Sequence, residues 1–145
     1  MRVIVDSSVL VAAMGRRSRV RRLLFRNGIE WVVPSEIRHE VLDRVDELAG
    51  RLKARPIDAR LFVVEILGRA TEIDLRPEEP ASRLARDLIG RRDPSDIPFV
   101  AAAIKLGALG VWSLDKDFDG IPGVPRFTTA GIERLLDLAG PSEEE

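Results

Sequence analysis

The sequence predicts an α/β fold built on a mainly parallel sheet, and two observations support that prediction. Short β-rich runs alternate with segments of helical periodicity along the whole chain, which is the pattern of repeated βα units. Two of those runs also end directly in an aspartate, residues 3–5 before Asp6 and residues 111–114 before Asp115. Open α/β sheets bind ligands at the carboxyl ends of their strands, so both aspartates are expected in one shared site.

Five strands and six helices are expected in chain order. Each strand is a short run of β-branched or other apolar residues, and each helix has apolar residues three and four positions apart. The strands are predicted at residues 2–5, 30–33, 72–75, 110–114 and 124–127. The helices are predicted at residues 19–27, 35–48, 56–68, 81–89, 95–106 and 130–138, with Ser35 capping the second and Thr128 or Thr129 the last.

The predicted helix at residues 35–48 presents two neighbouring stripes. The apolar stripe consists of Ile37, Val41, Val45 and Leu48, and the acidic stripe of Glu36, Glu40, Asp43 and Glu47. A solvated face is the simplest interpretation of most of the acidic stripe, because like charges at this spacing destabilise a helix. Glu40 is different, since it borders the apolar stripe midway along the helix and is positioned to reach a cleft beside the sheet.

Two further acidic residues lie at the start of the helix predicted at residues 95–106. Pro98 argues against a helix capped by Asp93, because it would then remove a backbone hydrogen bond in the second turn. Ser95 is therefore the predicted cap, which leaves Pro98 in the first turn. Asp96 then opens the helix, where it is favoured by the helix dipole or available to a ligand. Asp93 is interpreted as a turn residue or an outer partner of the site.

Composition restricts the chemistry that such a site can perform. The 145 residues fit one domain, expected at residues 1–139, with a disordered acidic tail at 140–145. There is no cysteine and only His39, which excludes thiolate and histidine-rich metal sites and leaves oxygen ligands that favour Mg²⁺ or Mn²⁺. The chain has no run of membrane-spanning length and starts directly in a strand, so a cytoplasmic protein with no membrane contact is expected.

The net charge of −1 hides one strongly basic segment. Residues 8–28 contain no acidic side chain but six arginines, Arg16, Arg17, Arg19, Arg21, Arg22 and Arg26. This segment is either a solvated helix face or a ridge that contacts phosphates near Asp6.

The alternating acids after the fourth predicted strand, Asp115, Asp117 and Asp119, have the opening of a calcium-binding EF-hand loop. That loop requires glutamate at its twelfth position, where this chain has Arg126, and it follows a helix rather than a strand. The EF-hand is therefore excluded. Ser8 stands where a haloacid-dehalogenase phosphatase needs its second aspartate, and no glycine-rich phosphate loop is present.

The sequence resembles the PIN-domain ribonuclease family (the PilT N-terminal domain), in particular its compact VapC-like toxin branch. The similar segments are VIVDSSVL at residues 3–10, PSEIRHEVL at 34–42, DIPFVAAAIKLG at 96–107 and WSLDKDF at 112–118, in the order that the family has. The resemblance covers nearly the whole chain. It implies a three-layer α/β/α fold with a central, mainly parallel sheet of four to five strands.

The resemblance also implies a site and a reaction. The metal ligands and catalytic residues would be Asp6, Glu40, Asp96 and Asp115, with Asp117 as a further ligand, directly or through water. Ser8, at a position where the family often has asparagine, would be auxiliary, and Asp93 and Asp119 have no firm counterpart. The implied activity is hydrolysis of RNA phosphodiester bonds with one or two Mg²⁺ or Mn²⁺ ions. The arginines from Arg16, Arg17 and Arg19 onward would hold flanking phosphates.

The implied partners are an RNA substrate, a second copy of the chain and an antitoxin encoded nearby. Apolar residues of the helix at 56–68, Leu61, Phe62, Val64 and Leu67, could form the dimer surface or belong to the core. Two rival functions remain open at this point. One is a DNA nuclease or a stand-alone RNA-processing nuclease on the same fold, and the other is a non-catalytic module that binds protein or RNA.

Overall fold

A five-stranded parallel sheet organises the chain, with strand order β3-β2-β1-β4-β5. The computed structural model describes residues 1–15, 18–89 and 92–140. The strands are β1 (Arg2–Val5), β2 (Glu30–Pro34), β3 (Thr71–Ile73), β4 (Val111–Trp112) and β5 (Arg126–Phe127). All five predicted strands are therefore present, three of them shorter than expected.

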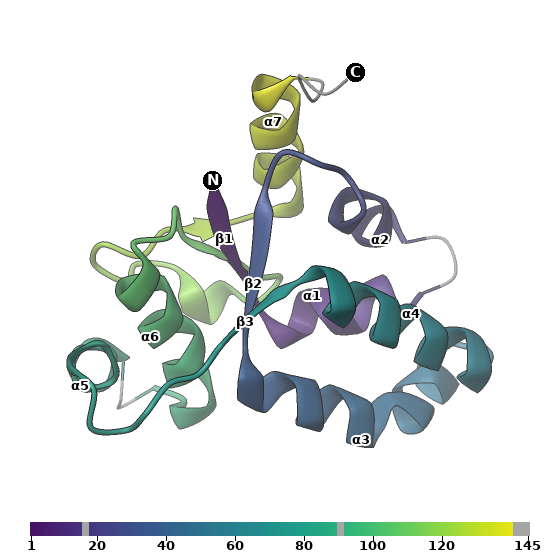
Figure 1. Cartoon of the computed structure of the whole chain (residues 1–145), viewed down its shortest axis with the longest axis horizontal. Helices are drawn as coiled ribbons and strands as arrows, with labels where there is room; N and C mark the ends of the chain where they lie inside the picture. The colour runs from purple at the N-terminus through teal and green to yellow at the C-terminus, as the bar shows by residue number, and fades with distance from the viewer. Residues whose placement is uncertain (16–17, 90–91, 141–145) are drawn as a thin grey trace.

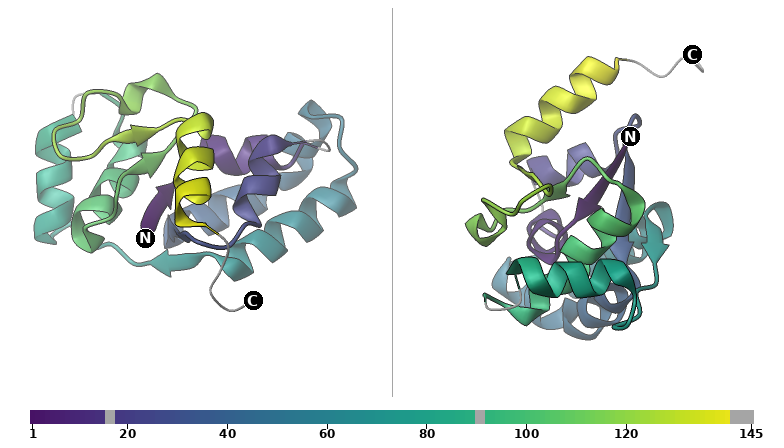
Figure 2. Two further views of the ribbon diagram at one scale, coloured as in Figure 1. Left: turned by 90° about the horizontal axis from the view of Figure 1, so that it is seen from above. Right: turned by 90° about the vertical axis from the view of Figure 1, so that its left-hand side faces the viewer.

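Helices cover both faces of the sheet, which gives the predicted three-layer α/β/α architecture (Figures 1 and 2). One side carries α5 (Pro80–Ile89) and α6 (Ile97–Leu106), with α6 against β1, β2 and β4. The other side carries α1 (Ser7–Ala13), α2 (Arg19–Leu24), α3 (Ser35–Arg51) and α4 (Pro56–Arg69). Helix α7 (Thr129–Ala139) follows β5 and contacts α2.

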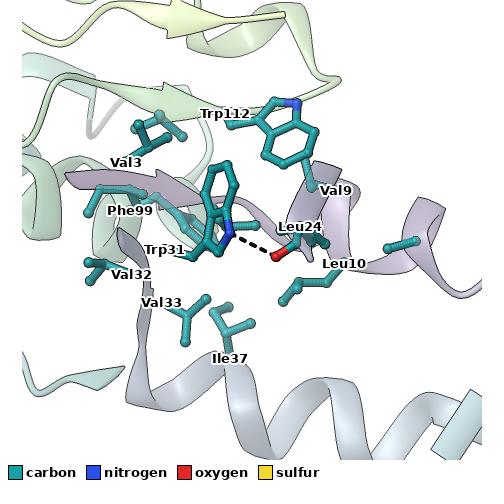
Figure 3. Packing of buried hydrophobic residues seen from close by; sticks show 14 of the residues in the cluster. Val3, Val9, Leu10, Leu24, Trp31, Val32, Val33, Ile37, Phe99 and Trp112 are labelled. Carbon is teal, nitrogen blue, oxygen red and sulfur yellow. Dashed lines mark hydrogen bonds between the residues drawn. The ribbon is translucent and has the colours of Figure 1, made fainter. Parts of the chain in front are cut away.

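The central strands are buried because they consist almost entirely of apolar residues, as parallel strands covered on both faces do. Val3, Ile4 and Val5 of β1 are at most 1% exposed. The indole rings of Trp31 on β2 and Trp112 on β4 pack against each other, with ring centroids 5.4 Å apart. The indole N–H of Trp31 donates to the carbonyl of Leu24 at 2.9 Å, which ties α2 to the sheet (Figure 3).

Two local features differ from the sequence-based expectation, and a third agrees with it. Residues 7–13 form helix α1, which was not predicted, because this apolar segment shows no one-sided periodicity and begins where Asp6 accepts the Ser8 N–H. Ser35 does not cap α3; its hydroxyl donates instead to Ile73 and Asp74, so it joins α3 to the end of β3. Thr128 is the cap of α7, as predicted.

Residues 141–145 of the predicted tail lie outside the described residues. Among the helices that the structure describes, none combines the length and the apolar character that crossing a membrane requires.

Gly110 permits the close approach of β4 and β5. A Cβ atom at this position would overlap the carbonyl oxygen of Pro125 and come within 2.9 Å of the Phe127 ring. We expect Gly110→Ala to lower the free energy of unfolding by about 3 kcal/mol, measured by urea denaturation. Gly68→Ala on α4 is the control, because nothing lies within 4 Å of the added atom. Equal stability of the two variants would contradict this account of the β4–β5 pair.

Candidate active site

The candidate site lies at the carboxyl end of the central strands, where β1 and β4 run side by side. The register pairs Val5 with Trp112, and the N–H of Asp6 donates to the carbonyl of Trp112 at 3.0 Å. This pairing places the first residue after β1, Asp6, next to the first residue after β4, Ser113. The strand order therefore brings the carboxyl ends of β1 and β4 side by side, as expected, and the shared site there stays a prediction.

Asp6 is a buried carboxylate held by hydroxyl groups. It is 4% exposed, and its Oδ2 accepts hydrogen bonds from the Ser8 hydroxyl at 2.6 Å and the Ser113 hydroxyl at 2.7 Å. The Ser7 hydroxyl reaches Oδ1 at 3.5 Å. A buried carboxylate is tolerated only with such partners, and these serines fix its direction.

Ser113 is the functional residue that sequence reasoning missed. It is fully buried, and besides donating to Asp6 its Oγ accepts the N–H of Asp115 at 3.0 Å. The Oγ of Ser8 lies 3.3 Å from the Oγ of Ser113 and accepts the N–H of Leu114 at 3.1 Å. The two serines thus join the start of α1 to the end of β4. The only sequence signal for Ser113 is a hydroxyl at the point where an apolar run meets the acidic run.

Asp117 lies in the short 3-10 helix η2 (Lys116–Phe118) that follows β4, and Asp115 directly precedes this helix. Asp115 caps this helix by accepting the N–H of Asp117 on its Oδ1 at 2.9 Å. Both acidic side chains are exposed to solvent. Phe118 anchors this short helix to the core, because its ring packs edge-on against Phe99 of α6.

Asp96 and Asp93 reach the same region from the short 3-10 helix η1 (Pro94–Asp96). Asp93 caps η1 by accepting the N–H and hydroxyl of Ser95 at 3.0 and 2.7 Å, and these bonds lower its pKa. The prediction that Ser95 caps a helix here was therefore wrong. Asp96 directly precedes α6, which leaves Pro98 in the first turn as expected.

The pKa of Asp96 reports how closely the acids gather. It is raised from the usual 3.8 to about 6, chiefly by partial burial and then by the carboxylates of Asp93, Asp6, Asp115 and Asp117 in that order of effect. Acids that follow β1, β4 and the α5–α6 connection therefore disfavour the ionised form of Asp96 at this edge. Repulsion of this kind is relieved by a cation.

The comparisons with known proteins agree with this geometry. A PIN domain family model matches residues 4–137. The chain belongs to the PIN domain family. Among solved structures it is similar to a chain in the crystal structure of VapBC2 from Rickettsia felis bound to a DNA fragment from their promoter. Identity is 13% and the TM-score 0.62, over 88% of this chain and 98% of that one. No curated protein matches the sequence.

The donor set of this PIN domain suits a hard cation. All candidate ligands are carboxylate or hydroxyl oxygens, which Mg²⁺ and Mn²⁺ prefer, and His39 is exposed on α3. Glu40 is also exposed on α3, and it is not among the charges that raise the pKa of Asp96. Within residues 1–15, 18–89 and 92–140, no three acidic or histidine side chains are placed to share one ion. An ion shared by three of these side chains would therefore require side-chain rotation.

The arginine-rich segment is largely engaged within the protein. Arg19 forms an ion pair with Glu133 of α7, and Arg26 pairs with Asp137 at 3.0 Å. Arg21 donates to the carbonyls of Ala13 and Met14 and stacks on the Phe62 ring. Arg16 and Arg17 lie outside the described residues. A role of Arg19 in substrate binding remains a prediction, and its contact with Glu133 would have to open first.

The raised pKa of Asp96 predicts a pH-dependent stability in metal-free protein. The folded state retains this proton up to pH about 6 and the unfolded chain only to about 3.8, so stability is lost as the pH rises through that window. We expect Asp96→Asn in EDTA to be more stable than the wild type above pH 6, by about 1 kcal/mol after solvent screening. Below pH 4 the difference should vanish.

Thermal unfolding at pH 4 and pH 7.5 measures this effect. Asp87→Asn on the exposed face of α5 is the control and should follow the wild type at both pH values. A wild type that matches Asp96→Asn at pH 7.5 would refute the crowding of carboxylates around Asp96.

Proposed function

We propose that this PIN domain is a metal-dependent endoribonuclease that hydrolyses RNA phosphodiester bonds and acts as the toxin of a toxin–antitoxin pair. The observation that supports it most is that the carboxylates of Asp6, Asp115 and Asp117 raise the pKa of Asp96 in addition to its partial burial, while Ser113 holds the buried Asp6 at the sheet edge. Membership of the PIN domain family supports a nuclease. The solved VapBC2 complex to which the chain is similar supports the toxin role.

The residues that would hold one or two Mg²⁺ or Mn²⁺ ions are Asp6, Glu40, Asp96, Asp115 and Asp117. When bound, the metal lowers the pKa of water and neutralises charge on a phosphodiester. Each protein group has a distinct task in this proposal. Asp6 presents a fixed oxygen because Ser8 and Ser113 occupy its Oδ2. Asp115 and Asp117 are exposed and approach the polyanion from the solvent side.

Electrostatics determines how the substrate is bound. The cluster of carboxylates repels RNA, so the protein binds phosphate at this edge only once cations have neutralised the cluster. Asp96 gains most from that neutralisation, because its ionised form is the one that its surroundings disfavour. Arg92 lies beside these acids, with its guanidinium donating to the carbonyl of Asp117 in η2. It supplies positive charge beside the site.

Replacing a central carboxylate tests the nuclease. Asp6→Asn and Asp115→Asn should each lower cleavage of RNA by about 100-fold or more, since even the outer partners of metal ligands contribute 10–100-fold. The measurement is cleavage of single-stranded RNA with Mg²⁺ or Mn²⁺ and with EDTA, beside single-stranded and branched DNA. Asp137→Asn, at the far end of α7, is the matched control and should retain activity.

The outcomes separate the rival functions. Preferential cleavage of branched DNA would indicate a DNA nuclease. A wild type that cleaves nothing and binds no Mn²⁺ by calorimetry, even with RNA present, would indicate a binding module. Equal activity of Asp6→Asn and the wild type would contradict the assigned site.

A second part of the proposal concerns partners. The outer face of α4 exposes three apolar side chains at positions i, i+4 and i+7: Ile57, Leu61 and Val64, which are 57%, 64% and 62% exposed. Phe62 and Leu67 of the same helix are buried, so only part of the expected set is available for a partner. An exposed apolar stripe of this kind supports a protein interface, and we assign it to a homodimer. An antitoxin remains a further proposed partner.

The dimer is tested with a charge on the stripe. Leu61→Asp should convert the dimer to a monomer, because a carboxylate cannot be buried unpaired in an apolar interface. Light scattering after gel filtration at micromolar concentration measures the mass. Leu138→Asp on α7, where the leucine is 84% exposed, is the control and should stay dimeric. A monomeric wild type would refute the assignment.

A further inference from the structure

The side chain of Arg126 contacts the segment that carries Asp115 and Asp117. Although it belongs to edge strand β5, its side chain is only 13% exposed. Its Nη1 donates to the carbonyl of Ser113 at 3.0 Å, and its Nε and Nη2 donate to the carboxylate of Asp119 at 2.6 and 3.4 Å. A planar guanidinium fork can make these bonds together, whereas a lysine ammonium cannot.

These bonds fix the segment from Ser113 to Asp119 at both of its ends. Ser113 is held on two sides, by Arg126 at its carbonyl and by Asp6 at its hydroxyl. Asp119 ends η2, and its carboxylate forms an ion pair with the Arg126 guanidinium. Asp119 is thus bound to the protein, while Asp115 and Asp117 between the two anchors present their carboxylates to solvent.

Arg92 holds the same segment from the opposite direction. Its Nη1 donates to the carbonyls of Asp117 and Asp119 at 3.1 and 3.3 Å. Arg92 directly precedes Asp93, the cap of η1, so it connects the segment after β4 to the segment that carries Asp96. Two stretches of chain that bear candidate ligands are therefore cross-linked by one side chain.

We propose that Arg126 and Arg92 form an arginine clamp that positions Asp115 and Asp117 against Asp6 and Asp96 for cation binding. The clamp rests on the proposed function of those carboxylates. Both arginines are positioning residues. In the described part of the chain, their guanidinium groups bond to backbone carbonyls and to Asp119, and not to the carboxylates of Asp6, Asp96 or Asp115.

The test compares Arg126→Met, Arg126→Lys and Arg92→Met with the wild type. Arg92 is exposed, so Arg92→Met should fold even if replacing the mostly buried Arg126 lowers the stability of the protein. Arg2→Met is the matched control. It also removes a 2.9 Å arginine–carboxylate bond, to Glu30 between β1 and β2, but at the amino ends of the strands, opposite the site.

Amide hydrogen exchange is the first measurement, because it reads the segment without depending on activity. The N–H of Asp115 is bonded to the Ser113 hydroxyl and the N–H of Asp117 to Asp115. Both should exchange about tenfold faster in Arg126→Met, the equivalent of one lost net hydrogen bond. Mn²⁺ affinity by calorimetry should fall about tenfold in Arg126→Met and in Arg92→Met, as for other partners of metal ligands. Arg126→Lys should recover only part of either effect.

The outcomes are distinct for the clamp and for the nuclease. Faster exchange with weaker Mn²⁺ binding, both absent in Arg2→Met, supports the clamp. Exchange that stays at the wild-type rate in Arg126→Met and Arg92→Met overturns it, and so does faster exchange with unchanged Mn²⁺ affinity. A wild type that binds Mn²⁺ but cleaves no RNA refutes the proposed function while the exchange and affinity results still decide the clamp.

Discussion

The pairing of β1 with β4, completed by the bond between Asp6 and Ser113, is the interaction on which the rest of the site depends. A carboxylate that is 4% exposed persists only if its hydrogen bonds are made, and Asp6 receives them from Ser8 on α1 and Ser113 after β4. The same contacts set where α1 begins and where the acidic segment leaves the sheet. A shift of one residue in the β1–β4 register would turn the side chains of one strand to the opposite face relative to the other strand, so that Asp6 and Ser113 would no longer meet.

Bringing several carboxylates together at this edge costs electrostatic free energy. The cost is limited because some of the acids are bound to other groups of the protein. Asp96 is crowded by four carboxylates, so its ionised form opposes folding in the absence of a cation. Asp119, two residues after Asp117, is neutralised by Arg126 instead, and Asp93 is used as a cap. Acids that look equivalent in the sequence are thereby divided into those that stabilise the local structure and those that remain open to solvent.

Prediction from sequence was accurate where the information is local and failed where it depends on distant contacts. The strands, and Asp6 and Asp115 at their ends, follow from apolar runs that stop abruptly, so their meeting at one edge could be expected. Ser113 carries no such signal, because a serine acquires its role only when β1 pairs with β4. The partner of Arg19 is equally invisible in the sequence, since Glu133 lies 114 positions away. Glu40 was inferred from helical spacing and from the family resemblance; it is exposed on α3, and its place in the site stays a prediction.

At 13% identity and a TM-score of 0.62, the VapBC2 chain shares the arrangement of the sheet and helices but few of the residues. Burial explains this, since the central strands require only apolar side chains of suitable volume, which many sequences supply. The fork of Arg126 and the hydroxyl of Ser113 are under a tighter constraint, because each makes a contact that a merely apolar or merely basic substitute would not reproduce.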